Sequence, residues 1–157
     1  MSLPRLLEYE TEAEYKDHFK RSYCRGAITT FDGIAVYFRP DKFDHAFYES
    51  SARDGNKDQF SFVRAQRLDW IKATLEHPEA DLYMGWDKRG KNYNPHRRVS
   101  VIYEDFVVII EIRQTKAGKL KGNFVTCYKA DNSIGKIRNA PEWKIKRFLS
   151  EGNKKGR

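Results

Sequence analysis

The sequence predicts an α+β fold in which an N-terminal β-hairpin and two helices pack on a four-stranded antiparallel sheet. Two observations support this class. Between residues 41 and 77, apolar side chains recur at the spacing of amphipathic helices. From Asp81 onward the pattern changes to the two-residue period of strands. Helices followed by a run of strands are typical of α+β domains.

The N-terminal part is expected to form a surface helix and then the hairpin. Glu8–Arg21 carries apolar residues at uneven helical spacing. Ala27–Phe31 and Ile34–Phe38 are rich in residues that favour strands. Asp32 and Gly33 join them, and this pair suits the positive φ angles of a type I′ turn.

Two helices are expected next. Asp41 has the side chain of an N-cap for a helix over Lys42–Ser51. After a polar linker, a second helix is expected over Ser61–His77, ahead of a proline. Arg64 and Arg67 fall on the apolar side of this second helix, which is unusual for arginine.

The second half of the chain is expected to supply the four strands, with Glu104 and Asp105 forming a tight hairpin turn. Residues 130–157 read as a basic C-terminal extension with a short helix at Trp143–Leu149, so that residues 1–157 make one domain. The predicted strands are Leu82–Trp86, Arg98–Tyr103, Phe106–Arg113 and Asn123–Lys129.

Composition excludes several classes of protein. With 39% hydrophobic and 33% charged residues, the chain is too apolar to be disordered and too charged to be a membrane protein. The longest uncharged apolar run, Phe106–Ile110, is far shorter than a bilayer span. The N-terminus lacks the apolar core of a signal peptide. We therefore expect a cytoplasmic protein without a membrane partner.

The cysteine and histidine pattern predicts no metal site. Cys24 and Cys127 lie over a hundred residues apart, and no Cys or His pairs show zinc-ligand spacing. No cluster of Asp and Glu suggests a two-metal nuclease either. We expect reduced structural thiols and neither a metal nor another cofactor.

The charge is unevenly distributed, and this favours a polyanionic partner. Residues 1–114 hold 18 Lys/Arg against 19 Asp/Glu, whereas residues 115–157 hold 12 against 3. Such an excess creates a local positive field that attracts phosphates. Nucleic acid, and RNA in particular, is the expected partner. A basic tail that only aids solubility is the alternative.

His45 is the first candidate for chemistry. On the predicted helix it faces away from Phe43 and Phe47, with Lys42 one turn before it and Glu49 one turn after. A carboxylate so placed can orient an imidazole. RNA cleavage needs an acid–base group of this kind and cations that stabilise the phosphorane. An exposed histidine on a salt-bridged helix face is the alternative.

The last predicted strand offers hydroxyl groups. Alternation places Phe124, Thr126 and Tyr128 on one face. Hydroxyl groups can hold a phosphate and an aromatic ring can stack on a base, although a half-buried strand has the same composition.

Several cations are candidate contacts to nucleic acid. The guanidinium groups of Arg64 and Arg67 can bind a phosphate in a bidentate manner, or their stems can simply cover the apolar side of the helix. Arg98 enters a strand and is a weaker candidate of the same kind. The remaining candidates are Lys42 beside His45, Lys129 at the end of the last strand, Lys136 and Arg138.

Three segments give the chain a resemblance to the barnase–EndoU–colicin–RelE-like nuclease superfamily, notably its phage-encoded members. They are residues 43–47 (FDHAF), residues 124–128 (FVTCY) and Arg98–Tyr103, within a region from Arg39 to Asp131. The resemblance implies metal-independent RNA cleavage with His45 as the acid–base group and Thr126 or Tyr128 near the phosphate.

The resulting expectation is a toxin-like or phage-type ribonuclease, which an immunity or antitoxin protein could accompany. Two alternatives stay open. One is a nucleic-acid-binding module without catalysis, and the other is an interaction protein that binds an acidic partner. Fold class alone does not choose among them.

Overall fold

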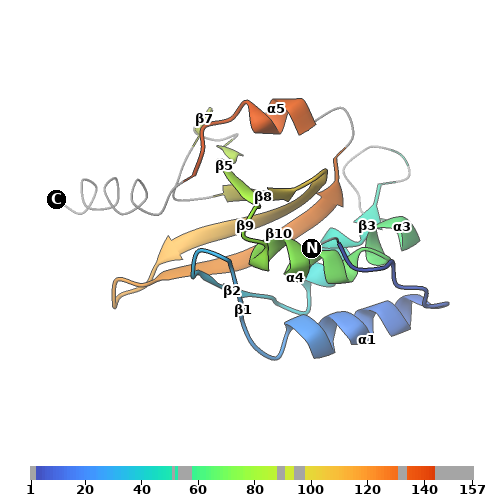
Figure 1. The fold of residues 1–157 in the computed structure, drawn as a ribbon. Helices are drawn as coiled ribbons and strands as arrows, with labels where there is room; N and C mark the ends of the chain where they lie inside the picture. Colours follow the sequence, from blue (N-terminus) through green and yellow to red (C-terminus); the bar gives the residue numbers. More distant parts are fainter. Residues whose placement is uncertain are drawn as a thin grey trace.

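The computed structural model describes residues 3–50, 52, 58–87, 91–93, 98–130 and 134–143, which form an α+β fold. Its centre is a six-stranded mixed sheet in the order β1-β2-β10-β9-β8-β5 (Figure 1). β3 pairs with β4, and β6 pairs with β7, in two small sheets. The strands are β1 (Ile28–Thr29), β2 (Ala35–Tyr37), β3 (Tyr48–Glu49), β4 (Gln59–Phe60), β5 (Asp81–Met84), β6 (Trp86–Asp87), β7 (Asn92–Tyr93), β8 (Arg98–Tyr103), β9 (Phe106–Gln114) and β10 (Leu120–Lys129).

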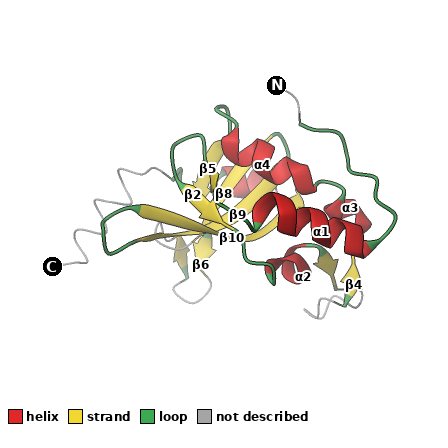
Figure 2. Cartoon of the chain, turned by 90° about the horizontal axis from the view of Figure 1, so that it is seen from below, coloured by secondary structure: helices red, strands yellow, loops and turns green. Residues whose placement is uncertain are grey.

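The helices lie on opposite sides of the central sheet. Figure 1 shows α5 on one side of the sheet and α1, α3 and α4 on the other, and Figure 2, seen from that other side, shows α2 beside them. No helix within the described residues combines the length and the apolar character that crossing a membrane requires. The helices are α1 (Glu12–Tyr23), α2 (Lys42–Ala46), α3 (Phe62–Ala65), α4 (Leu68–Glu76) and α5 (Ile134–Arg138).

The predicted four-stranded antiparallel sheet is not confirmed. β5, β8, β9 and β10 do pair antiparallel in that order. However, β2 pairs parallel to the start of β10, with Ala35 opposite Lys121 and Tyr37 opposite Asn123, so the N-terminal hairpin becomes part of the same sheet. Segments this far apart in the chain leave no local pattern that reveals their pairing.

The hairpin between β1 and β2 has a different turn from the one predicted. A type I′ turn needs positive φ at both central residues, but only Gly33 has it, at +94°, while Asp32 does not. The Thr30 side chain organises the loop instead. Its hydroxyl accepts a hydrogen bond from the Ile34 N–H at 2.9 Å and donates one to the Asp32 carboxylate. By contrast, the tight turn expected at Glu104 and Asp105 is confirmed.

The predicted helix over Lys42–Ser51 is too long. α2 ends at Ala46, and the chain then enters β3, because the Phe47 ring is fully buried and its carbonyl accepts a hydrogen bond from Ser61 at 2.8 Å. Asp41 occupies the N-cap position of α2, as predicted, but its side chain makes no capping hydrogen bond. Its carboxylate accepts a hydrogen bond from Arg39 at 3.2 Å.

The predicted helix over Ser61–His77 is broken into α3 and α4. Ser61 caps α3 by accepting a hydrogen bond from the Arg64 N–H at 3.2 Å, and a turn at Gln66 and Arg67 precedes α4. The turn shifts the helical phase. The continuous helical periodicity that placed Arg64 on the same side as Leu68 therefore does not extend across residues 64–68.

Smaller differences concern the ends of elements. The first helix begins later than predicted, because Thr11 caps it by accepting from the Glu14 N–H at 3.3 Å. The strand predicted at Leu82–Trp86 is divided between β5 and β6. The helix predicted at Trp143–Leu149 lies, after Trp143, outside the described residues.

The C-terminal extension is more ordered than predicted through Trp143. After α5, which sequence periodicity did not indicate, residues 141–143 run beside β5. The Met84 N–H donates to the Pro141 carbonyl at 2.8 Å, and the Trp143 N–H donates to the Leu82 carbonyl at 2.9 Å. The Trp143 side chain is buried in the main core.

Phe19 of α1 lies at the centre of the core between the sheet and α1–α4. Its ring centroid is 5.8–6.2 Å from the centroids of five other rings. A smaller cluster on the α5 side contains Ile102 and Val107, with Ile137 packed on it. The five aromatic neighbours of Phe19 are Tyr23, Phe38, Phe43, Phe47 and Phe124.

We predict that Phe19→Ala lowers the free energy of unfolding by about 3–5 kcal/mol, because it leaves a cavity among rings from the helices and from β10. Phe31→Ala is the matched control, since the Phe31 ring is 37% exposed. It should cost about 1 kcal/mol or less. Urea unfolding measures both. Equal losses from the two variants would contradict the central position of Phe19.

Candidate nucleic-acid interface

A pocket between α3 and β10 gathers five of the predicted site residues. β2 pairs with β10 only over residues 121–123, and α2 and α3 also pack against β10. The pocket has a volume of about 280 Å³. We call it the α3–β10 pocket, and it is lined by Glu49, Val63, Arg64, Arg67, Phe106, Cys127, Tyr128 and Lys129.

Arg64 lies between this pocket and the α2–β3 segment. Its Nε atom is 3.5 Å from a carboxylate oxygen of Glu49, and its Nη1 atom donates to the Ala46 carbonyl at 3.4 Å. The Arg64 side chain is 28% exposed. The guanidinium therefore has a carboxylate and a carbonyl as partners at the edge of the core, and one face of its fork remains near solvent.

Arg67 lies in the turn between α3 and α4. Its guanidinium carbon is 5.1 Å from the centroid of the Trp70 ring, and its Nη1 atom donates to the Val63 carbonyl. Its Nε atom is buried and has no hydrogen-bond partner in the described structure. A buried donor without an acceptor is costly, and an anion in the pocket is one group that could satisfy it.

Lys129 closes the pocket at the end of β10, where its ammonium group is 3.8 Å from the Asp105 carboxylate. Two arginines and one lysine therefore line the pocket against one carboxylate, that of Glu49. The pocket has an excess of positive charge, which favours an anionic ligand.

A β-bulge in β10 changes the predicted alternation. The register shifts between Phe124 and Thr126, because Val125 is an extra residue relative to β9. Phe124 therefore shares the α1–α4 side with Cys127, whereas Tyr128 packs on the α5 side and Thr126 shares its face. The prediction that all three of Phe124, Thr126 and Tyr128 share a face is wrong for Phe124.

The two hydroxyl residues of β10 differ in their surroundings. The Thr126 hydroxyl oxygen is buried and has no partner among the described residues. Burial raises the pKa of Tyr128, while the positive charge of Arg64 acts in the opposite direction. Tyr128 consequently keeps its proton at neutral pH and can donate a hydrogen bond.

His45 and Lys42 lie on α2 and do not line the α3–β10 pocket. His45 is exposed, as predicted, and precedes Ala46, whose carbonyl Arg64 contacts. The predicted pairing of His45 with Glu49 across one helical turn is wrong, because Glu49 belongs to β3.

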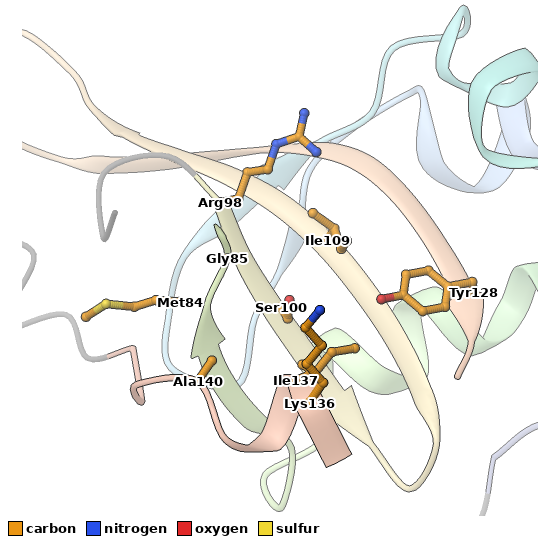
Figure 3. Close-up of a pocket in the computed structure, with 9 residues that line it drawn as sticks. All are labelled: Met84, Gly85, Arg98, Ser100, Ile109, Tyr128, Lys136, Ile137 and Ala140. Carbon is orange, nitrogen blue, oxygen red and sulfur yellow. The ribbon is translucent and has the colours of Figure 1, made fainter. Parts of the chain in front are cut away.

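A second pocket, of about 230 Å³, lies between α5 and the sheet. Three predicted residues line it: Arg98, Tyr128 and Lys136. Figure 3 shows the Tyr128 hydroxyl and the Lys136 ammonium directed into the hollow, while the Arg98 guanidinium points away from its floor. Arg98 Nε is 3.8 Å from the Glu111 carboxylate. We call it the α5–sheet pocket, and its other lining residues are Met84, Gly85, Ser100, Ile109, Ile137 and Ala140.

Arg138 has a structural role in the described contacts. Its Nη1 atom donates to the Asp81 carboxylate at 3.0 Å, and its Nη2 atom donates to the Glu104 carbonyl at 2.9 Å. These bonds attach α5 to β5 and to the β8–β9 turn. The predicted role of Arg138 in binding phosphate thus competes with two existing bonds.

Sequence reasoning missed the apolar walls of both pockets, such as Val63 and Ile109, because exposed or half-buried apolar residues have no distinctive local pattern. In the described part of the chain, no three of His, Cys, Asp and Glu gather as metal ligands do.

Comparisons with known proteins add no family to this description. No family model matches the chain, and no curated protein and no solved structure matches it.

We predict that the two thiols react very differently in the folded protein. Burial raises the pKa of Cys127 to about 12, whereas Cys24 is half-buried with a less raised pKa. Because the thiolate is the reactive form, a thiol reagent at about pH 8 should label Cys24 alone. Mass spectrometry of the wild type and of Cys24→Ser measures this. Rapid labelling of the folded Cys24→Ser variant would contradict the buried position of Cys127.

Proposed function

We propose that this protein is a metal-independent ribonuclease whose scissile phosphate binds in the α3–β10 pocket. One observation supports the proposal above all others. Arg64, Arg67 and Lys129 line one pocket together with Glu49 and Tyr128, and Arg64 is ion-paired with Glu49. These are the groups that metal-free phosphodiester cleavage requires: cations for the phosphate and a group that transfers a proton.

The proposed reaction is attack by the ribose 2′-oxygen on the adjacent phosphorus. Glu49 removes the proton from the 2′-hydroxyl as the bond to phosphorus forms. His45 of α2, the acid–base group that the sequence suggested, is assigned the donation of a proton to the 5′-oxygen as its bond to phosphorus breaks. The products are a 2′,3′-cyclic phosphate and a 5′-hydroxyl, and water need not enter this step.

The cations stabilise the negative charge that develops on the phosphorane. The guanidinium groups of Arg64 and Arg67 can each donate two hydrogen bonds to phosphate oxygens, and Lys129 supplies a third positive charge. Tyr128 also lines the α3–β10 pocket, but its hydroxyl is directed into the α5–sheet pocket and Thr126 shares that face, so the cations are the groups that hold the phosphate here. Lys42 on α2 adds positive charge beside His45.

One observation favours a binding module without catalysis. Glu49 is ion-paired with Arg64 at 3.5 Å, so its carboxylate already has a cationic partner in the pocket. In that alternative the same pocket binds a phosphate and does not cleave the strand. The immunity-type or acidic protein partner stays a prediction from the sequence.

We predict that Glu49→Gln and His45→Ala each reduce RNA cleavage by about 10²–10⁴-fold without lowering the melting temperature, as loss of one proton-transfer group does. Glu76→Gln, an exposed position on α4, is the control for Glu49→Gln. Gel analysis should show cyclic-phosphate ends, and chelators should not inhibit.

Arg64→Lys keeps the positive charge but loses the planar guanidinium that can bind a phosphate in a bidentate manner, so this variant should also weaken cleavage.

The same RNA assays distinguish the ribonuclease from the binding module. RNA that is bound but not cleaved by the wild type would support the binding module. Cleavage that survives both Glu49→Gln and His45→Ala would show that this pair does not perform the chemistry.

We also predict that RNA binding weakens steeply as salt concentration rises. The slope of log K against log salt is about −0.7 for each neutralised phosphate of a single strand. Truncation after Trp143 should flatten the slope, because residues 144–157 contain six Lys/Arg and one Asp/Glu. Trp143 is retained because it is buried in the core. Absence of RNA binding even at low salt would contradict the proposal.

A further inference from the structure

The side of the sheet that carries α5 has a region beyond α5 with a basic and aromatic surface. Val36 is fully buried against the α1–α4 side, so alternation directs Tyr37 to the α5 side. The register of the strands places three further side chains beside Tyr37 on this face, so that a row of side chains crosses four strands. The row consists of Tyr37 on β2, Asn123 on β10, Glu111 on β9 and Arg98 on β8.

Next to this row, two cations face one another. Lys121 of β10 lies directly opposite Arg113 of β9. Like charges at directly opposed positions destabilise a sheet, and a bound anion would remove that cost. The ammonium of Lys121 is 4.7 Å from the centroid of the Tyr37 ring, and Tyr37 is 43% exposed. An exposed ring beside paired cations is the arrangement that binds a base and its phosphates.

The β9–β10 hairpin continues this surface. Between Glu111 and Asp131 the chain contains five Lys/Arg and no acidic residue. Figure 1 shows the tip of this hairpin projecting beyond the other strands of the sheet. Within the row itself, Glu111 is the one carboxylate, and Arg98 is its partner.

The α5–sheet pocket lies at the other end of the same surface. Its walls include Ile109, Ile137 and the Tyr128 ring, and Figure 3 shows two polar head groups directed into it, the Tyr128 hydroxyl and the Lys136 ammonium. Apolar walls with a few convergent polar groups suit a flat heteroaromatic ring with a polar edge. At about 230 Å³ the pocket is small, as a site for a single base would be.

We propose that this side of the sheet binds single-stranded RNA, with one unpaired base in the α5–sheet pocket and the backbone running along Arg98, Arg113 and Lys121 toward Tyr37. The inference rests on the proposed ribonuclease function and gives its substrate class. Tyr128 lines both pockets, which lie on opposite sides of β10, so a strand that passes around the end of β10 would present a base to one pocket and a phosphate to the other. A base in a duplex is stacked and paired, and therefore cannot enter.

The test uses a short fluorescein-labelled 2′-O-methyl oligonucleotide, which lacks the attacking hydroxyl and cannot be cleaved by the proposed route. Fluorescence anisotropy measures its affinity for the full chain, single-stranded and as a duplex, over a range of salt concentrations. We expect tighter binding of the single strand. Arg113→Ser with Lys121→Ser should reduce the salt slope by about 1.4, the contribution of two phosphate contacts. Lys20→Ser with Lys72→Ser removes the same charge from α1 and α4 and should leave the slope near that of the wild type.

A third variant, Ala140→Leu, reduces the volume of the α5–sheet pocket without changing charge. It should weaken single-strand binding by roughly fivefold or more, the effect of losing one stacked base. Equal slopes for the two double variants, or duplex binding as tight as single-strand binding, would overturn the inference. Because the probe is not cleaved, these binding results do not depend on catalysis. If the protein binds the probe as expected but does not cleave RNA, the proposed ribonuclease function is wrong and the inference about single-strand binding stands.

Discussion

The parallel pairing of β2 with β10 determines how the rest of the molecule is arranged. It covers only residues 121–123, and it brings the N-terminal hairpin into a sheet otherwise built from the second half of the chain. Beyond Asn123, β10 is contacted by α2 and α3, which bring Arg64 to the strand. A longer β2 would compete for this position. The short parallel pairing therefore permits both the core around Phe19 and the α3–β10 pocket.

The electrostatics of the pocket follow from where the helices end. α2 ends because the Phe47 ring enters the core, and this places Glu49 on a strand within 3.5 Å of Arg64. The break between α3 and α4 brings Arg67 to the same pocket. Each cation is held at the edge of the core, where an ion is less hydrated than at the surface and its interaction with a phosphate is stronger.

The sequence predicted the fold class and many of the strands, because β8 and β9 are rich in β-branched residues that favour strands. It also singled out Arg64, whose position on a helix was unusual. Three features were not predictable from local pattern. The bulge at Val125 adds one residue without a sequence signal, the end of α2 depends on a tertiary contact of Phe47, and the β2–β10 pairing joins distant segments. Consequently the sequence singled out each of these residues as a candidate but did not predict that they line one pocket: Glu49, Arg64, Arg67, Tyr128 and Lys129.

The position of β10 has a consequence for how the protein is made. Among the described residues β10 is the last strand along the chain, yet it lies inside the sheet between β2 and β9. During synthesis the N-terminal helices and hairpin emerge before β10. Until β10 has been made, the Phe38 ring lacks Phe124, on which it stacks in the folded protein. Contacts of such long sequence separation close slowly. Glu49 and Arg64 are thus translated well before Tyr128 and Lys129, so the pocket can be complete only after nearly the whole domain has left the ribosome.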